Sequence, residues 1–310
     1  MGYAVVLGEA LIDLQEAERD GEVIYRQAIG GAPLNVAVGA TRLGGQVQYV
    51  GSLSDDVLGN RISVFLTENG VGTAGVKRVA VPTTLAVTTF VGAEPTFTFY
   101  GEPPSYSVLG PNDLDTATVA GADVVYTGSI CLLREPFRAA ARAAWAVPGP
   151  LRVFDPNARP TLLPDGAAVT HLRELSEEFF ATADLVKLSA ADAEVLYDGA
   201  SPEKAAERIR DLGAKAVVVT AGSKGAYVSA ADGATMLAAP KVDAVDATGA
   251  GDSVMGALVR RLLADGLPAD LQGWERSVQF ALNVAGLVCE RRGGAVAMPT
   301  NEEVIARWGA

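Results

Sequence analysis

The sequence predicts a doubly wound α/β fold, in which helices cover both faces of a mostly parallel sheet. Residues 3–7, 151–154 and 216–220 are short apolar runs of the kind that form strands buried on both faces. Stretches with helical spacing of apolar residues alternate with such runs. The chain has 310 residues, 49% of them hydrophobic, without an internal repeat or a long linker, so we expect one domain over residues 1–310.

Composition and charge argue against several classes of function. The net charge of −12 disfavours nucleic acid and anionic membranes as partners. His171 is the single histidine, which argues against a histidine-based triad or a histidine-rich metal site. Cys131 and Cys289 lie in apolar stretches and are expected to be buried thiols in a reducing compartment. There is no signal-peptide pattern and no apolar run of membrane-spanning length, so we expect a cytoplasmic protein.

The first expected strand, residues 3–7, places a carboxylate near its end. Asp13 follows this strand by a few residues. Ligands of open α/β sheets bind at the carboxyl ends of the strands. Asp13 is therefore either a ligand-binding residue or an ordinary loop carboxylate.

Two adjacent glycines, Gly30 and Gly31, precede a helix expected over residues 36–43. Paired glycines adopt backbone angles that other residues resist, so they form either a hinge or a simple tight turn. Asn35 projects from the opening turn of the helix, where it can face a ligand.

A small second sheet is expected from two segments, about residues 14–29 and 83–101. The first has a hairpin pattern, and the second contains two runs whose alternation indicates a sheet buried on one face only. Together they would form a lid, and the alternative is that they are edge strands of the main sheet. Between them a helix begins, with Ser54 or Asp55 as the expected N-cap.

Charged side chains follow two further strands. The strand at residues 151–154 leads into a string that contains Asp155 and Arg159. The forked guanidinium of Arg159 suits an anionic or oxygen-rich ligand group, or an ion pair with Asp155. On the next strand, Lys187 either reaches a phosphate or extends to solvent from the strand end. Ser189 and Asp192 then have the spacing of a helix capping box.

A glycine-containing loop follows the strand at residues 216–220. Its pattern, Thr-x-Gly-x-x-Gly, offers backbone N–H groups to phosphates, although a hairpin turn has the same composition. The residues concerned are Thr220, Gly222, Ser223 and Gly225.

The most specific stretch is Asp-Ala-Thr-Gly-Ala-Gly-Asp at residues 246–252, which opens a helix. The backbone N–H groups of Gly249, Ala250 and Gly251 would form an anion cradle, helped by the helix dipole. Asp252 lies beside that cradle, where a carboxylate can take a proton from an attacking hydroxyl. The alternative is an Asp that merely stabilises the helix N-terminus.

This string resembles the signature of the ribokinase-like (PfkB) family of sugar kinases. The resemblance implies a ribokinase-like fold and phosphoryl transfer from MgATP to a primary hydroxyl of a sugar. In the family, the Gly-Ala-Gly backbone is the anion hole for the transferred group. The last carboxylate of the string, here Asp252, is the base that activates the sugar hydroxyl.

The resemblance extends to the sugar site. The family's Asp and Asn at the positions of Asp13 and Asn35 bind sugar hydroxyls, and a di-glycine matching Gly30 and Gly31 joins the lid to the main domain. The Asp-x-Asn-x-Arg string that contains Arg159 resembles fructokinases and 2-keto-3-deoxygluconate kinases, whereas ribokinases lack this arginine. Fructose is therefore the favoured substrate, 2-keto-3-deoxygluconate the second, and ribose or nucleosides the third.

The resemblance to the family also implies sites for ATP and for cations. The loop after Thr220 matches the family's nucleotide loop. An Asn-x-x-Glu pattern that holds Mg²⁺ through water is replaced here by Ser189 and Asp192, which leaves Asp192 as the metal-site candidate. Asn283 matches an Asn near the adenine, although it could instead be hydrogen-bonded in the core. The carbonyls of Asp246 and Thr248 match those that hold a monovalent cation such as K⁺ in relatives.

Two other classes of protein are alternatives to a kinase. A non-catalytic sugar or nucleotide sensor on the same scaffold would not need Asp252. A dinucleotide-binding dehydrogenase would show Gly-x-Gly-x-x-Gly after the first strand, where this chain has Gly8, Glu9 and Ala10. Lid strands can pair between subunits, so the pattern is compatible with a homodimer.

Overall fold

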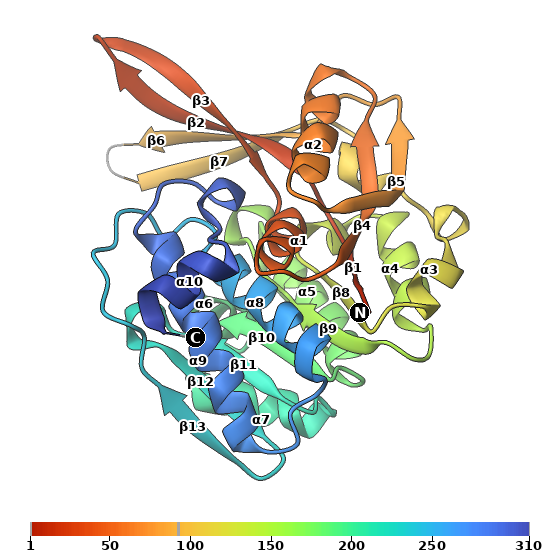
Figure 1. Cartoon of the computed structure of the whole chain (residues 1–310). Helices are drawn as coiled ribbons and strands as arrows, with labels where there is room; N and C mark the ends of the chain where they lie inside the picture. The colour runs from red at the N-terminus through yellow and green to blue at the C-terminus, as the bar shows by residue number, and fades with distance from the viewer. Residues whose placement is uncertain (1, 92–93, 310) are drawn as a thin grey trace.

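The computed structural model describes residues 2–91 and 94–309, and it confirms the α/β class (Figure 1). A nine-stranded sheet runs through the molecule, and it is parallel from β11 to β5, whereas β12 and β13 are antiparallel additions at one edge. In spatial order its strands are β13 (Gly233–Leu237), β12 (Ala226–Ala230), β11 (Val217–Thr220), β10 (Leu185–Ser189), β9 (Leu151–Asp155), β8 (Val124–Gly128), β1 (Ala4–Leu7), β4 (Val47–Ser54) and β5 (Gly72–Val79).

Helices pack on both faces of this sheet and enclose two cores (Figure 1). On β1, Ala4 and Val6 belong to one core and Val5 and Leu7 to the other, as expected for a strand buried on both faces. The helices are α1 (Ala32–Arg42), α2 (Val57–Glu68), α3 (Thr116–Ala120), α4 (Phe137–Trp145), α5 (Gly166–Phe180), α6 (Ala190–Leu196), α7 (Pro202–Leu212), α8 (Ala250–Asp265), α9 (Leu271–Cys289) and α10 (Asn301–Trp308).

A separate four-stranded sheet lies over one end of the molecule. Its order is β3 (Glu22–Gly30), β2 (Leu11–Arg19), β6 (Leu85–Val91) and β7 (Glu94–Tyr100), so these strands are not edge strands of the main sheet. Residues 92–93, inside the second segment expected for a lid, lie outside the described residues.

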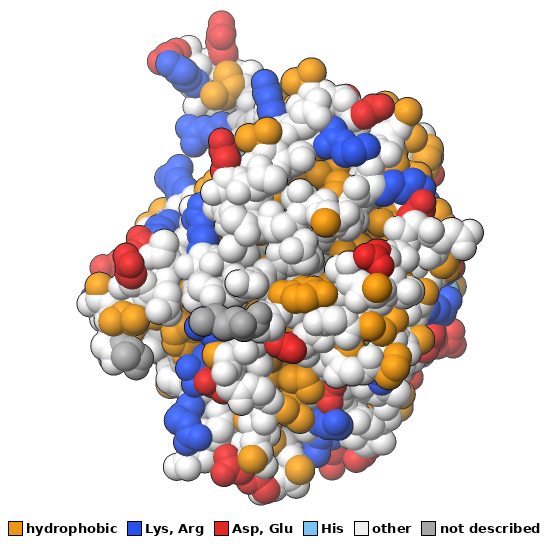
Figure 2. Space-filling view, turned by 45° about the vertical axis from the view of Figure 1, so that its right-hand side comes forward, with side chains coloured by type: hydrophobic (Ala, Val, Ile, Leu, Met, Phe, Trp, Pro, Cys, Tyr) orange, Lys and Arg blue, Asp and Glu red, His pale blue; other side chains and the backbone are white. Residues whose placement is uncertain are grey.

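The β2–β3 ribbon projects beyond the rest of the molecule (Figure 1). Figure 2 shows acidic and basic side chains gathered at its projecting end. Among them, Arg19 and Asp20 form an ion pair whose side chains are 77% and 91% exposed. The tip of the ribbon is therefore a charged surface.

Two details differ from the sequence-based expectation. The N-cap of α2 is Asp56, not Ser54 or Asp55, because β4 continues through Ser54. The Asp56 carboxylate accepts hydrogen bonds from Gly59 and Thr83 that outweigh its partial burial and lower its pKa to about 2. Of the two thiols, Cys131 is buried as predicted, but Cys289 is only half-buried.

Within residues 2–91 and 94–309, we find no helix with the length and apolar character needed to span a membrane.

Candidate active site

The N-terminus of α8 has the geometry of an anion cradle. Gly249 adopts the left-handed conformation, with φ of 78°, and a Cβ there would lie 2.9 Å from the Cα of Gly294. The Ala250 N–H already donates to the Ala247 carbonyl at 3.1 Å. For the N–H groups of Gly249, Gly251 and Asp252, no protein acceptor lies within hydrogen-bond distance in the described residues. Of the three predicted cradle groups, those of Gly249 and Gly251 are therefore free to bind an anion and that of Ala250 is not, because it is engaged in the turn; the Asp252 N–H is an additional free donor.

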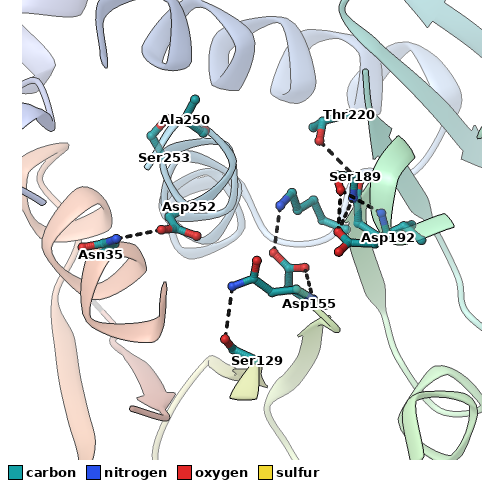
Figure 3. A network of polar contacts seen from close by, with 12 residues as sticks. Asn35, Ser129, Asp155, Ser189, Asp192, Thr220, Ala250, Asp252 and Ser253 are labelled. Atoms are coloured by element: carbon teal, nitrogen blue, oxygen red, sulfur yellow. Dashed lines mark hydrogen bonds and ion pairs between the residues drawn. The ribbon is translucent and has the colours of Figure 1, made fainter. Parts of the chain in front are cut away.

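Asp252 lies in the first turn of α8 and is 8% exposed. The Asn35 side chain donates its Nδ2–H to Asp252 Oδ2 at 2.7 Å, and the two residues point toward each other in Figure 3. Among the described residues, no protein donor reaches Asp252 Oδ1 or pairs with the buried Oδ1 of Asn35. Asp252 thus has one oxygen fixed by Asn35 and one that no protein donor occupies in the described residues.

The di-glycine segment brings Asp13 to the same place. Gly31 has φ of 114°, and a Cβ there would lie 2.4 Å from the carbonyl oxygen of Glu9. A Cβ at Gly30 would lie 2.0 Å from Asp13 Oδ2, so any larger residue there would displace this carboxylate. Burial raises the pKa of Asp13 to about 6; the charge of Arg159 opposes this and that of Asp252 adds to it. The structure therefore brings Asp13, Asn35 and Asp252 into one site.

Arg159 is exposed, and it does not pair with Asp155. Its Nη1 makes a long hydrogen bond of 3.4 Å to the Ala158 carbonyl. Its charge acts to lower the pKa of both Asp13 and Glu9. The guanidinium therefore lies within electrostatic range of the Asp13 site and remains available to a ligand.

Lys187 and Asp155 form a buried ion pair instead. Their Nζ and Oδ2 are 2.8 Å apart, and the side chains are 3% and 1% exposed. Burial tends to lower the pKa of Lys187, but Asp155, Asp192 and Asp252 outweigh it and raise that pKa. A Cβ at Gly251 would lie only 3.1 Å from Lys187 Nζ. The ammonium thus lies beside the cradle, and the expectation that Lys187 extends to solvent is wrong.

The capping box predicted at the start of α6 is present. Asp192 Oδ2 accepts hydrogen bonds from the N–H and the hydroxyl of Ser189, both at 2.7 Å, and Ser189 Oγ accepts the Asp192 N–H. Asp192 Oδ1 accepts the Ala158 N–H at 2.8 Å. Asp192 therefore also fixes the segment that leads to Arg159.

The nucleotide-loop candidates lie at the end of β11. Thr220 Oγ1 donates to the Leu188 carbonyl at 3.4 Å, which ties the loop to the end of β10 (Figure 3). Gly222 and Gly225 have positive φ values of 56° and 102°, and Ser223 between them is exposed. The loop also joins the antiparallel strands β11 and β12, so the hairpin interpretation describes its backbone correctly.

Two other candidate segments are placed as follows. Asn283, on α9, is half-buried and accepts a hydrogen bond from Gln279 at 3.3 Å; no contact with the cradle is seen in the described residues. Asp246 Oδ1 accepts the Thr248 N–H at 2.9 Å, and its Oδ2 accepts the Gly293 N–H at 3.0 Å. These bonds outweigh partial burial and lower the pKa of Asp246. The backbone carbonyls of Asp246 and Thr248 accept no hydrogen bond in the described part of the chain.

Sequence reasoning missed Glu9, Ser129 and Asn157 as site residues. Glu9 is 2% exposed, and its Oε1 accepts the Ser129 hydroxyl at 2.7 Å; the Asn157 Nδ2–H donates to Ser129 Oγ at 3.1 Å. Ser129 and Asn157 both have positive φ, which is uncommon for residues other than glycine. A carboxylate directly after the first strand was the signal that could have identified Glu9.

The candidate site residues follow strands on either side of β1, where the strand order of the main sheet reverses. β1 pairs with β4 on one side and with β8 on the other. Ligands of doubly wound sheets usually bind at such a reversal, beyond the carboxyl ends of the strands. Five acidic side chains lie there within electrostatic range of Lys187 or Arg159, so the site is suited to a ligand that brings cations. The acidic side chains are Glu9, Asp13, Asp155, Asp192 and Asp252.

Comparisons with known proteins find similarity over almost the whole chain. The model of the pfkB family of carbohydrate kinases matches residues 1–301. A fructokinase-1 of Oryza sativa subsp. japonica is 34% identical over 316 residues, covering 97% of this chain and 96% of the relative. Among solved structures, a fructokinase of Vibrio cholerae O395 with fructose, ADP and calcium has a TM-score of 0.86 at 27% identity and covers 99% and 98% of the two chains.

A second solved structure differs in its sugar. An aminoimidazole riboside kinase of Salmonella enterica, with aminoimidazole riboside and an ATP analogue, has a TM-score of 0.86 at 25% identity. The superposition covers 99% of this chain and 100% of the riboside kinase chain. The same fold therefore accommodates different sugars.

Proposed function

Because the chain belongs to the pfkB family of carbohydrate kinases, and is thus a phosphotransferase acting on a sugar hydroxyl, we propose that its sugar is fructose. The main support for phosphoryl transfer is the position of Asp252. Its carboxylate accepts a hydrogen bond from Asn35 at 2.7 Å and lies next to free N–H groups at the start of α8. The fructokinase relatives and the Arg159 string support fructose among the sugars.

The transfer follows from the roles of these side chains. Asp13, Asn35 and Arg159 bind and orient the sugar. Asp252 Oδ1 takes the proton from a primary hydroxyl as the hydroxyl oxygen attacks the γ-phosphorus and ADP leaves. The N–H groups at the start of α8, beside Gly251, stabilise the charge on the transferred group, and Lys187 adds a nearby positive charge.

ATP use is supported by related kinases solved with ATP or an ATP analogue. The loop with Thr220, Gly222, Ser223 and Gly225 would hold the nucleotide phosphates, and Asn283 would lie toward the adenine. Among the described residues no group of three or more His, Cys, Asp or Glu is placed to hold a metal ion. Mg²⁺ binds mainly through water and substrate phosphates, so Asp192 and the neighbouring Asp155 fit a water-mediated site. Bound there, Mg²⁺ would neutralise phosphate charge.

A lid completes the proposal. The four-stranded sheet is joined to the main domain at Gly30 and Gly31, next to Asp13. Closing it over the sugar would exclude water and so limit wasteful hydrolysis of ATP.

We expect K⁺ to increase the rate. The Asp246 and Thr248 carbonyls have no hydrogen bond from the described residues, and the Gly293 N–H fixes the Asp246 side chain between the two loops. Free carbonyl oxygens at one place suit a weakly hydrated monovalent cation. Initial rates in K⁺ and in tetramethylammonium at equal ionic strength test this site. Equal rates in the two salts would contradict it.

The substrate is tested by ADP release with MgATP against fructose, 2-keto-3-deoxygluconate, ribose, glucose and aminoimidazole riboside. Fructose should give the highest kcat/KM. A preference for 2-keto-3-deoxygluconate that is lost in Arg159→Ala would instead assign Arg159 to a carboxylate. If no sugar is turned over while calorimetry shows ATP binding, a sensor replaces the kinase.

We expect kcat/KM for the sugar to fall as the pH decreases through about 6. The pKa of Asp13 is raised from its ordinary 3.8 to about 6, so its carboxylate is ionised above this pH and protonated below it. The ionised form accepts charge-assisted hydrogen bonds from sugar hydroxyls at both oxygens, whereas protonation removes the charge and turns one oxygen into a donor. The measurement is kcat/KM for the sugar between about pH 5 and 8, which reports the free enzyme. A step that persists in Asp13→Asn would contradict the assignment and point to Asp155, whose pKa burial also raises to about 6.

A further inference from the structure

We propose that Glu9 is a positioning residue for phosphoryl transfer: its Oε1 accepts the first hydrogen bond of two routes of contacts, and both routes lead to the first turn of α8. The proposal rests on the proposed role of that turn as the place of transfer. Glu9 itself lies at the end of β1 and does not belong to the sugar-binding or nucleotide-binding residues named above.

The first route runs through α1. Glu9 Oε1 accepts the N–H of Ala32, the first residue of α1, at 3.2 Å. The N-cap of this helix is Gly31, which has no side chain, and no acidic residue lies in its first turn. Glu9 therefore supplies from 23 positions away the capping oxygen that helices usually obtain locally.

The position of α1 determines the position of Asn35, because Asn35 lies one turn after the capped end. Asn35 in turn holds Asp252 at 2.7 Å. The two helices are in close contact further along, where a Cβ at Gly256 of α8 would lie 3.0 Å from the Val36 carbonyl oxygen. A shift of the α1 N-terminus would therefore move the side chain that orients the base.

The second route runs across the strand ends. Glu9 Oε1 also accepts the Ser129 hydroxyl at 2.7 Å, and Ser129 Oγ accepts the Asn157 Nδ2–H at 3.1 Å. The Asn157 N–H donates to Asp155 Oδ1 at 3.0 Å, and Asp155 Oδ2 pairs with Lys187 at 2.8 Å. Lys187 Nζ lies beside Gly251 of the same first turn. Figure 3 shows the part of this route from Ser129 to Asp155.

Both routes depend on one oxygen of a buried side chain. Glu9 Oε2 has no hydrogen-bond partner within the described part of the chain, so Oε1 alone makes these contacts. Residues that act through others at a catalytic centre are effective because a displacement of about 1 Å can lower a rate about 10²-fold. Glu9 thus links the base on one side with the positive charge on the other.

The experiment compares Glu9→Ala, Glu9→Gln and Ser129→Ala, using whichever sugar the unmodified enzyme turns over. Glu9→Ala should lower kcat about 10²-fold with little change in the two KM values. Glu9→Gln keeps an oxygen that can accept both bonds, so kcat should recover to within about 10-fold of the unmodified enzyme. Ser129→Ala interrupts only the second route and should lower kcat about 3- to 10-fold.

The matched control is Thr127→Val. Thr127 lies on β8 two positions before Ser129, and its buried hydroxyl has no partner in the described residues, so the variant should keep the kcat of the unmodified enzyme. In the double variant Glu9→Ala/Ser129→Ala the loss should be no larger than in Glu9→Ala, because both changes break the same route.

Three results would overturn the proposal: a folded Glu9→Ala enzyme with unchanged kcat, a Glu9→Gln enzyme as slow as Glu9→Ala, or independent multiplication of the two losses. If Glu9→Ala does not fold, the test uses the other two variants. Glu9→Gln must then keep near-normal kcat, and Ser129→Ala must still show the lower kcat. A Ser129→Ala enzyme with the kcat of the unmodified enzyme would overturn the proposal. Failure of the proposed function gives different results. If the unmodified enzyme is inactive with fructose, the substrate assignment is wrong, and the Glu9 variants are compared on another sugar. If Asp252→Asn is active, the assignment of the base is wrong, and the Glu9 variants can still be compared.

Discussion

Asp252→Asn should lower kcat by at least about 10²- to 10⁴-fold, the usual contribution of a general base. The substitution preserves shape, and the Asn side chain can still present an oxygen to Asn35 Nδ2, so the bond of 2.7 Å and the first turn of α8 should remain. What is lost is the carboxylate that takes the proton. The measurement is single-sugar turnover together with a thermal or urea unfolding curve.

The matched control is Asp270→Asn. Asp270 also lies at a helix start, as the N-cap of α9, where its carboxylate accepts the Gly273 N–H at 2.8 Å. Asn is an equally good N-cap, so this variant should keep full activity and stability. An Asp252→Asn enzyme with normal kcat would end the assignment of Asp252 as the base.

Lys187→Met should reduce the free energy of unfolding by about 3–5 kcal/mol and also abolish most of the activity. The side chains of Lys187 and Asp155 are 3% and 1% exposed, so removing the ammonium leaves a buried carboxylate without its partner. A protein domain is stable by only about 5–15 kcal/mol, so this loss is severe. The loss of a positive charge beside Gly251 should lower kcat of the folded fraction about 10²-fold or more.

A second substitution separates the two effects. In Lys187→Met/Asp155→Asn the buried charge is gone, so most of the stability should return while the activity stays low. The control is Lys215→Met: Lys215 pairs with Asp184 at 2.7 Å but its side chain is 63% exposed, so the loss should stay below about 1 kcal/mol. If Lys187→Met were as mild as Lys215→Met, the buried pair would not have the importance given to it here.

The sequence predicted those features that depend on residues close together in the chain. The string at residues 246–252 predicted a helix start with free N–H groups, and the structure has it at α8. The spacing of Ser189 and Asp192 predicted the capping box, which is present. Apolar runs located the strands, because a doubly buried strand needs such residues at successive positions.

The features that were missed depend on distant residues. The contact between Glu9 and Ser129 joins residues 120 positions apart, and no local pattern specifies it. Lys187 could not be assigned as buried, because its partner Asp155 is on another strand. Asp56 rather than Ser54 caps α2 because β4 extends further than its apolar run indicates.

The central position of β1 has a consequence for how the chain acquires activity during synthesis. Ala4 pairs with Val47 on one side and Val124 on the other, so β1 needs a partner, β8, that is synthesised much later than β1 itself. The pairing of β2 with β3 is local and can form early, whereas β2 also pairs with β6 and Asn35 meets Asp252 across 217 positions. A nascent chain that ends before Asp252 lacks the proposed base, so we expect no kinase activity until that residue has been synthesised and has met Asn35.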